Sequence, residues 1–269
     1  MGAAWAWPCT ERDRRRLQRE ITSAPKKKSE KFTDEVEAID SNFLVAFTKS
    51  HRLDAFLRSH TEQAYSPVAV AQHPSQQFHA LVVFQKTESI TLYKSPTGTF
   101  RSFNSAITGK FPEDWRSNLE HDLNQLYEMH AMDFLGSVVE ESGGYNFAFC
   151  QHDLVENHSS SFYVTSISQP IDAEHLQSVL NEQQIIKQGT FRAAVFHESD
   201  VLLVFENSRR PLKKNYVVTE IPYVGADNFE QEFVNKIELC TVDQRLEFAG
   251  LASCSMTQQL FVVLAIDLS

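Results

Sequence analysis

Residues 170–207, PIDAEHLQSVLNEQQIIKQGTFRAAVFHESDVLLVFEN, carry the local signals that decide the fold class. Asp172, two residues after Pro170, is a typical helix N-cap, and Gly189 can take the left-handed conformation that ends a helix. The spacing of the apolar residues between them predicts an amphipathic helix, whose inward face holds Leu176, Val179, Leu180 and Ile186. The runs 191–197 and 201–206 then predict a hairpin of two buried strands. A helix followed by an antiparallel pair indicates an α+β protein.

Similar signals extend over the rest of the chain. A long amphipathic helix is predicted at 113–140, between Pro112 and Gly143, and a short one begins at Ser50. Alternating or continuous apolar runs predict strands at 78–84, 89–94, 99–103, 145–150, 161–168, 216–223, 233–239, 246–248 and 260–268. The fold class is therefore α+β, with mostly antiparallel sheets of about ten strands, two long helices and a short one.

Two parts of different composition are expected. Residues 1–40 mix charges with prolines and form a basic arm, for which disorder is the default, and residues 41–269 form a globular body. The body is one unit or two fused lobes divided near residue 189. The chain shows no repeat of fixed period, only a loose recurrence of a strand pair followed by a helix.

The arm concentrates positive charge in an otherwise acidic chain. Residues 1–31 hold nine Lys and Arg against four Asp and Glu, whereas the whole chain has a net charge of −10. The clusters Arg14, Arg15, Arg16 and Lys26, Lys27, Lys28 resemble a bipartite nuclear localisation signal, which an import carrier reads as two cationic groups on an extended chain. The alternatives are a solvated tail in a cytoplasmic protein and, less favoured because of its acidic residues, a mitochondrial presequence.

One cationic group stands in the acidic body. Arg209, Arg210, Lys213 and Lys214 lie in the connection after the strand at 201–206, where they could contact phosphate or an acidic partner. A solvated loop is the alternative. Because the rest of the body repels phosphate backbones, contact with nucleic acid is expected through the arm only.

Catalytic signatures are sparse in the sequence. It contains no phosphate-binding glycine loop, no GxSxG, no HExxH and no histidine pair at ligand spacing, so we expect no cofactor and no metal site. The remaining candidates are Cys150 as a nucleophile, with His152, or with His197 and Asp200, as base and orienting carboxylate. A buried structural cysteine is the simpler interpretation of Cys150.

These observations favour a non-catalytic adaptor subunit of an intracellular, nuclear multiprotein assembly. Protein partners and an import carrier are the expected partners, and no stretch is long and apolar enough for a membrane span. Two alternatives stay open: a Cys/His-dependent hydrolase or transferase of unfamiliar sequence, and a nucleic-acid-associated factor that uses the basic arm.

Overall fold

A computed structural model describes residues 41–60, 65–86, 99–105, 107, 112–130, 132–151, 161–168, 170–198, 200–207, 213–222, 229–243, 246–254 and 258–268. Asp40–Ser269 forms one compact unit. Within the described residues there are four α-helices and twelve strands. The strands form one six-stranded and two three-stranded sheets. The α+β class is therefore confirmed, with more strands than the ten expected.

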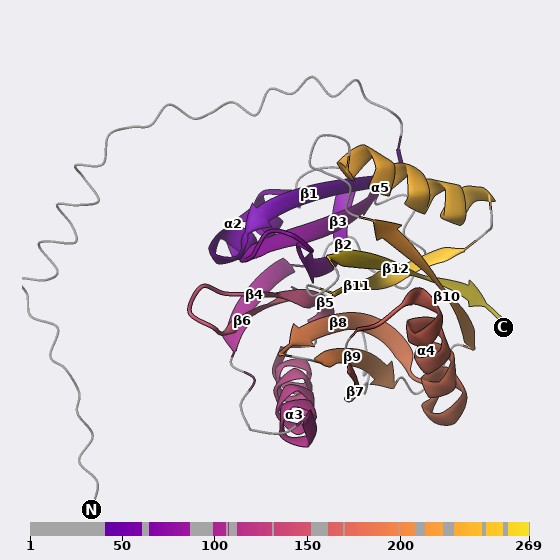
Figure 1. Ribbon diagram of the computed structural model, residues 1–269. Coiled ribbons are helices and arrows are strands. Elements are labelled where there is room, and N and C mark those ends of the chain that lie inside the picture. Colours follow the sequence, from indigo (N-terminus) through magenta and orange to yellow (C-terminus); the bar gives the residue numbers. More distant parts are fainter. Residues whose placement is uncertain are drawn as a thin grey trace, which may run out of the picture. The chain divides into compact units, whose positions relative to one another are not determined.

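A single unit of strand, helix and hairpin builds the whole body and occurs four times (Figure 1). In each unit, which we call a module, the last strand pairs antiparallel with the first. Module 1 consists of β1 (Phe43–Lys49), α2 (Leu53–His60), β2 (Tyr65–Gln72) and β3 (His79–Lys86). Module 2 consists of β4 (Thr99–Ser105), α3 (Pro112–His130), β5 (Met132–Val139) and β6 (Tyr145–Gln151).

The second half of the chain repeats the pattern. Module 3 consists of β7 (Ser161–Ser168), α4 (Ala173–Lys187), β8 (Thr190–His197) and β9 (Asp200–Asn207). Module 4 consists of β10 (Lys214–Pro222), α5 (Phe229–Glu238), β11 (Glu247–Cys254) and β12 (Gln259–Asp267). A 3-10 turn, Ser50–Arg52, precedes α2, and a π-helical turn, Leu239–Asp243, follows α5. The modules begin at unequal intervals, which hid the repeat from a search for a fixed period.

The predicted helix at 113–140 is wrong in its last third. Helix α3 ends at His130, and β5 occupies Met132–Val139. Phe134 and Val138 fit a helical spacing of four, but Gly136 between them has a φ of 134° that no right-handed helix contains. The β-branched pair Val138 and Val139 also favours a strand.

The predicted strand at 233–239 is a helix. Phe229, Phe233, Val234 and Ile237 are buried on one face of α5, at helical spacing. The exposed Asn235 breaks any strand alternation but fits the outer face of a helix. Two strands that the sequence signals missed, β1 and β2, complete module 1.

The helix predicted to start after Asp172 is confirmed in its position and its start. Asp172 caps α4 by accepting a hydrogen bond from the backbone N of His175 at 2.7 Å. Its end differs, because Gln188 and not Gly189 takes the left-handed conformation. Ile186, predicted to face inward, is exposed, and Gln184 fills the buried position one turn after Leu180.

The third element of each module is the inner strand of a closed ring. β2 contacts β5, β5 contacts β8, β8 contacts β11, and β11 contacts β2. Of these four contacts between described strands, only that of β2 with β5 is a backbone pairing. It is parallel and joins Val70 to Gly136. This pairing merges modules 1 and 2 into the six-stranded sheet.

A β-bulge recurs in all four inner strands and is followed each time by a small residue. The residues after the bulge are Ala69, Gly136, Ala193 and Gly250. A Cβ placed on Gly136 would meet the carbonyl oxygen of Val70 at 1.8 Å, and one on Gly250 would meet the carbonyl oxygen of Arg192 at 3.1 Å. Small residues are therefore what lets the inner strands approach one another.

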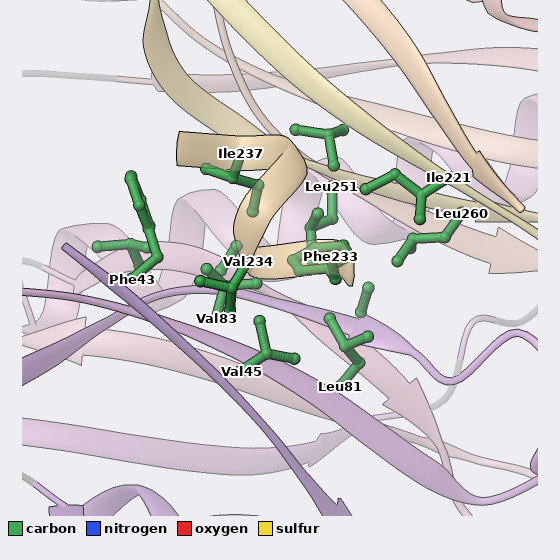
Figure 2. Packing of buried hydrophobic residues seen from close by; sticks show 14 of the residues in the cluster. Phe43, Val45, Leu81, Val83, Ile221, Phe233, Val234, Ile237, Leu251 and Leu260 are labelled. Atoms are coloured by element: carbon green, nitrogen blue, oxygen red, sulfur yellow. The ribbon is translucent and has the colours of Figure 1, made fainter. Parts of the chain in front are cut away.

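Each helix covers the first strand of the next module, and α5 closes the ring onto β1. Four hydrophobic clusters fill the spaces between successive modules. Figure 2 shows the closing cluster, where Phe233 and Val234 of α5 lie between Val45 and Val83 of module 1 and Leu251 and Leu260 of module 4. The core is thus divided among the boundaries between modules, and Gly189 lies inside module 3.

The modules all run in the same sense. In each module the first and the inner strand are parallel, because both pair antiparallel with the last strand, so the helix that joins them runs antiparallel to the first strand. The hydrogen bonds show that α3 and α4 also run antiparallel to β7 and β10 of the next modules. The inner strands therefore all end, and the last strands all begin, at one end of the ring, which we call the hairpin end. At the other end, the strand-entry end, the first strands begin and the helices and last strands finish.

Candidate functional site

A histidine and a tyrosine meet at the hairpin end, between modules 2 and 3. His197 is the last residue of β8, and Tyr145 is the first residue of β6. The Tyr145 hydroxyl donates to the Phe196 carbonyl at 3.0 Å and lies 2.5 Å from His197 Nδ1. Trp115, in the first turns of α3, packs edge-on against the imidazole with the ring centroids 4.5 Å apart. Three elements of two modules thus meet at one imidazole ring.

Both titratable rings in this cluster are neutral near pH 7. Burial lowers the pKa of His197 by more than the carboxylates of Glu198 and Asp200 raise it. Burial, and then the negative charge of Glu198, raise the pKa of the Tyr145 hydroxyl. The single hydroxyl proton of Tyr145 is donated to the Phe196 carbonyl. The contact between the hydroxyl oxygen and His197 Nδ1 is therefore assigned to a proton on Nδ1, which leaves Nε2 of the neutral ring as the acceptor. Such an imidazole could act as a base only toward a group that reaches Nε2, and the His197 side chain is 9% exposed.

Cys150 is on the other side of the same sheet. Side chains alternate along β6, so Tyr145, Phe147 and Phe149 face module 3, and Ala148 and Cys150 face module 1. Cys150 is buried beside Leu53 and Leu57 of α2. The structure therefore places His197 and Cys150 on opposite faces of β6.

The other predicted site residues are distributed as follows. Asp200 is buried and stands opposite His197 in the register of β8 and β9. Lys213 is exposed, and Lys214 forms an ion pair with Glu247 at 3.0 Å. His152, Arg209, Arg210 and the import candidates Arg14, Arg15, Arg16, Lys26, Lys27 and Lys28 lie outside the described residues.

A buried ion pair lies toward the other end of the β8–β9 hairpin, away from His197. Arg192, the bulge residue of β8, donates from Nε and Nη2 to Glu206 Oε2 on β9. Burial lowers the pKa of Arg192, but the carboxylates of Glu206 and Asp133 raise it by more. The pKa is therefore raised overall, and the guanidinium stays charged. Because the pair satisfies its own charges between two strands, it has a structural role.

The exposed large apolar side chains lie at the strand-entry ends of several elements. Within the described residues they are Leu44, Ile185, Ile186, Leu239, Ile266 and Leu268. All six lie near the start of β1 or at the ends of α4, α5 and β12. Ile185 and Ile186 are the most exposed, at 79% and 64%. Sequence reasoning missed them, although two adjacent isoleucines on a helix cannot both face the same core.

The described residues contain no group of three or more His, Cys, Asp or Glu side chains that could hold a metal ion. Among the helices of the same residues, none has the length and apolar character of a membrane span. No protein-family model matches the chain, and no curated protein or solved structure is significantly similar to it. A fold alone does not define a function, which depends on the chemistry of particular sites and surfaces.

Proposed function

We propose that this chain is a non-catalytic interaction subunit of an intracellular, nuclear multiprotein assembly. The observation that carries the proposal is that the exposed apolar side chains of the described residues lie at the strand-entry ends of their elements. Single exposed apolar residues are ordinary on protein surfaces, whereas a group confined to one end of a molecule is typical of a contact surface.

The energetics of the group agree with this role. Burying an isoleucine side chain that is otherwise exposed contributes about 1.5–3 kcal/mol to an association. Ile185 and Ile186 contribute little of this to the fold itself, since both project from the last turn of α4. A partner that covered them would gain that free energy.

The proposed mode of contact is a side-chain surface. A partner strand would need a free sheet edge, and the outer strands already receive side-chain hydrogen bonds from the helices. The backbone N of Ser102 in β4 bonds to Asp54, and that of Val218 in β10 bonds to Gln177. Covering an outer strand in this way restricts the addition of a further strand.

The nuclear part of the proposal rests on the arm. Arg14–Arg16 and Lys26–Lys28 supply the two cationic clusters that an import carrier reads. Residues 1–40 fused to a fluorescent reporter should bring it into the nucleus, and replacing Lys26, Lys27 and Lys28 by Ala should return it to an even distribution. A reporter that ignores this replacement would remove the nuclear address but leave the interaction role in place.

The interaction role is tested by purifying the tagged full chain from cells that express it at its natural level. We expect stoichiometric companions that survive washing at moderate salt. A chain that purifies as a lone monomer contradicts the role and favours the enzyme alternative, for which His197 is the first residue to replace by Gln. Companions that depend on added nucleic acid and vanish on deleting residues 1–40 would favour the nucleic-acid alternative.

A further inference from the structure

We infer that the boundary between modules 1 and 2 holds a binding site for one buried water molecule, which bridges Ser50 Oγ and Asn146 Oδ1. Ser50 follows the end of β1 and Asn146 is the second residue of β6, so the site lies at the hairpin end. Both oxygens are buried, and no described residue forms a hydrogen bond with either of them. The inference does not depend on the proposed interaction role.

The hydrogen bonds of Asn146 fix the orientation of its side-chain amide. Nδ2 donates to the Ser50 carbonyl at 3.0 Å and to Glu140 Oε1 at 3.1 Å, and both of these partners are acceptors. Exchanging the amide nitrogen and oxygen would place an acceptor against two acceptors, so the assignment holds. Oδ1 is therefore the acceptor of a residue that is only 5% exposed, and it needs a donor that the described residues do not supply.

Ser50 contributes the second unpaired oxygen. Its backbone N donates to the Phe78 carbonyl at 2.8 Å. Its own carbonyl accepts from the backbone N of Leu53 and from Asn146 Nδ2. Both backbone groups are thus paired, whereas the hydroxyl of this residue, which is 1% exposed, has no partner among the described residues. A hydroxyl that can donate and an amide oxygen that can only accept therefore belong to two side chains at the same buried place.

The two oxygens require a small partner that can both accept and donate. Folded proteins place ordered water next to buried polar atoms that would otherwise lack a partner, on the order of one buried water per 27 residues. A water can accept from the Ser50 hydroxyl and donate to Asn146 Oδ1, and two hydrogen bonds of about 2.8 Å reach across about 5.5 Å. This reach suits two oxygens that form no direct hydrogen bond.

The water also accounts for a polar residue in an apolar row of β6. Asn146, Ala148 and Cys150 alternate with the residues that face module 3, and the last two pack against module 1. An asparagine at this position is stable only if both ends of its amide are bonded. With the water in place, the amide connects the turn that enters α2 to Glu140 at the end of β5 and leaves no group unpaired.

A crystal structure of the full chain, at a resolution that shows ordered water, tests the site directly. We expect one compact electron-density peak at about 2.6–3.2 Å from both Ser50 Oγ and Asn146 Oδ1. A direct hydrogen bond between the two oxygens overturns the inference, as does another part of the chain that fills the place of the peak. Density with the size of an organic molecule, or with the short contacts of a metal ion, also overturns it.

A double-mutant cycle tests whether the water links the two side chains in solution. Urea unfolding is compared for Ser50→Ala, Asn146→Ala and the double variant. Loss of either oxygen already removes the bridge, so the combined change in the unfolding equilibrium constant should fall short of the product of the single changes by at least about threefold. If Asn146→Ala does not fold, Asn146→Ser takes its place in the cycle.

Ser117→Ala is the matched control for the serine. The Ser117 hydroxyl donates to the Glu113 carbonyl on the exposed side of α3, so its removal should combine independently with Asn146→Ala. Independent effects of Ser50→Ala and Asn146→Ala would overturn the bridge. Equal coupling in the control pair would overturn it as well, because the coupling would then not belong to the water site.

Discussion

The side-chain amide of Asn124 bonds to both backbone groups of Phe162: its Oδ1 accepts from the Phe162 N at 2.7 Å, and its Nδ2 donates to the Phe162 O at 2.9 Å. In the next module, Asn181 makes the same two bonds to Tyr216, at 2.7 and 3.0 Å. One turn earlier on each helix, a side-chain oxygen accepts a hydrogen bond from the backbone N of the strand residue two positions after Phe162 or Tyr216. These oxygens belong to Glu120 and Gln177. The helices thus replace the missing neighbour strand at the outer edge of each sheet.

Replacing Asn181 by Leu should destabilise the protein by about 1–3 kcal/mol, because the N–H and C=O of buried Tyr216 lose their partners. Urea unfolding followed by circular dichroism measures the change. Asn235→Leu is the control, since Asn235 is exposed on α5 and bonds only within its helix, to Gln231. Equal effects of the two substitutions would contradict an edge-covering role for Asn181.

Replacing Gly136 by Ala should prevent stable folding or cost several kcal/mol. The new Cβ would collide with the Val70 carbonyl, and a φ of 134° is strained for any side chain. Gly143→Ala is the matched control: its φ of 85° is also strained, but nothing lies within 4 Å of its Cβ. The control should lose only about 1 kcal/mol. Comparable thermal shifts in the two variants would show that the contact between β2 and β5 is unimportant.

His73 should make the protein less stable in mild acid. Its Nδ1 accepts from the backbone N of Ser75 at 3.1 Å and of Gln76 at 2.9 Å, which only a neutral ring can do. Burial, and then the positive charge of His79, lower the pKa of His73 from 6.5 to about 4. The unfolded chain therefore binds the proton more tightly, and stability falls as the pH drops from 6.5 to 4, by about 3 kcal/mol at about 1.4 kcal/mol per pKa unit.

The substitution His73→Asn tests this pH dependence. Asn can accept from the same turn residues but does not titrate, so the variant should keep most of the stability at pH 7. Other groups also titrate in this range, so the readout is the difference between the two unfolding curves across pH. Parallel curves from pH 7 to pH 4 would show that His73 is not the source.

Removing one partner of the Arg192–Glu206 ion pair should lower the stability more than removing both partners. Glu206→Leu leaves the buried guanidinium without its main partner and should lose about 3–5 kcal/mol. The double variant Arg192→Met/Glu206→Leu, which removes both charges, should recover at least about 1 kcal/mol of this loss. Denaturant midpoints of the three proteins measure the difference. A double variant less stable than Glu206→Leu would mean that Arg192 stabilises the fold through Asp133 instead.

The candidate site was only partly visible in the sequence. His197 and Asp200 were candidates as base and orienting carboxylate for Cys150. Their tertiary partners Tyr145 and Trp115 belong to another module, so no local spacing could connect them to His197. The alternation of side chains along β6 predicts that Cys150 and Tyr145 face opposite sides of the sheet. Only the fold shows which of the two sides is covered by module 3.

The repeat also left a faint signal. In three of the inner strands a phenylalanine precedes the bulge and a small residue follows it, as Phe134 and Gly136 do in module 2. The later modules repeat this with Phe191 and Ala193, and with Phe248 and Gly250. The same interval separates Phe134 from Phe191 and Phe191 from Phe248. Module 1, which has Pro67 at this position and a different interval, conceals the pattern.

The sequence by itself determined the elements whose signals are local: the capped start of α4, the hairpin of β8 and β9, and the α+β class. Capping, turn chemistry and apolar periodicity act within a few residues, so they can be read along the chain. Only the tertiary structure decided that Val138 belongs to a strand, that Phe233 lies on a helix and that four modules close a ring. Those outcomes depend on contacts such as that of Gly136 with Val70, where steric fit between distant segments overrides local preference.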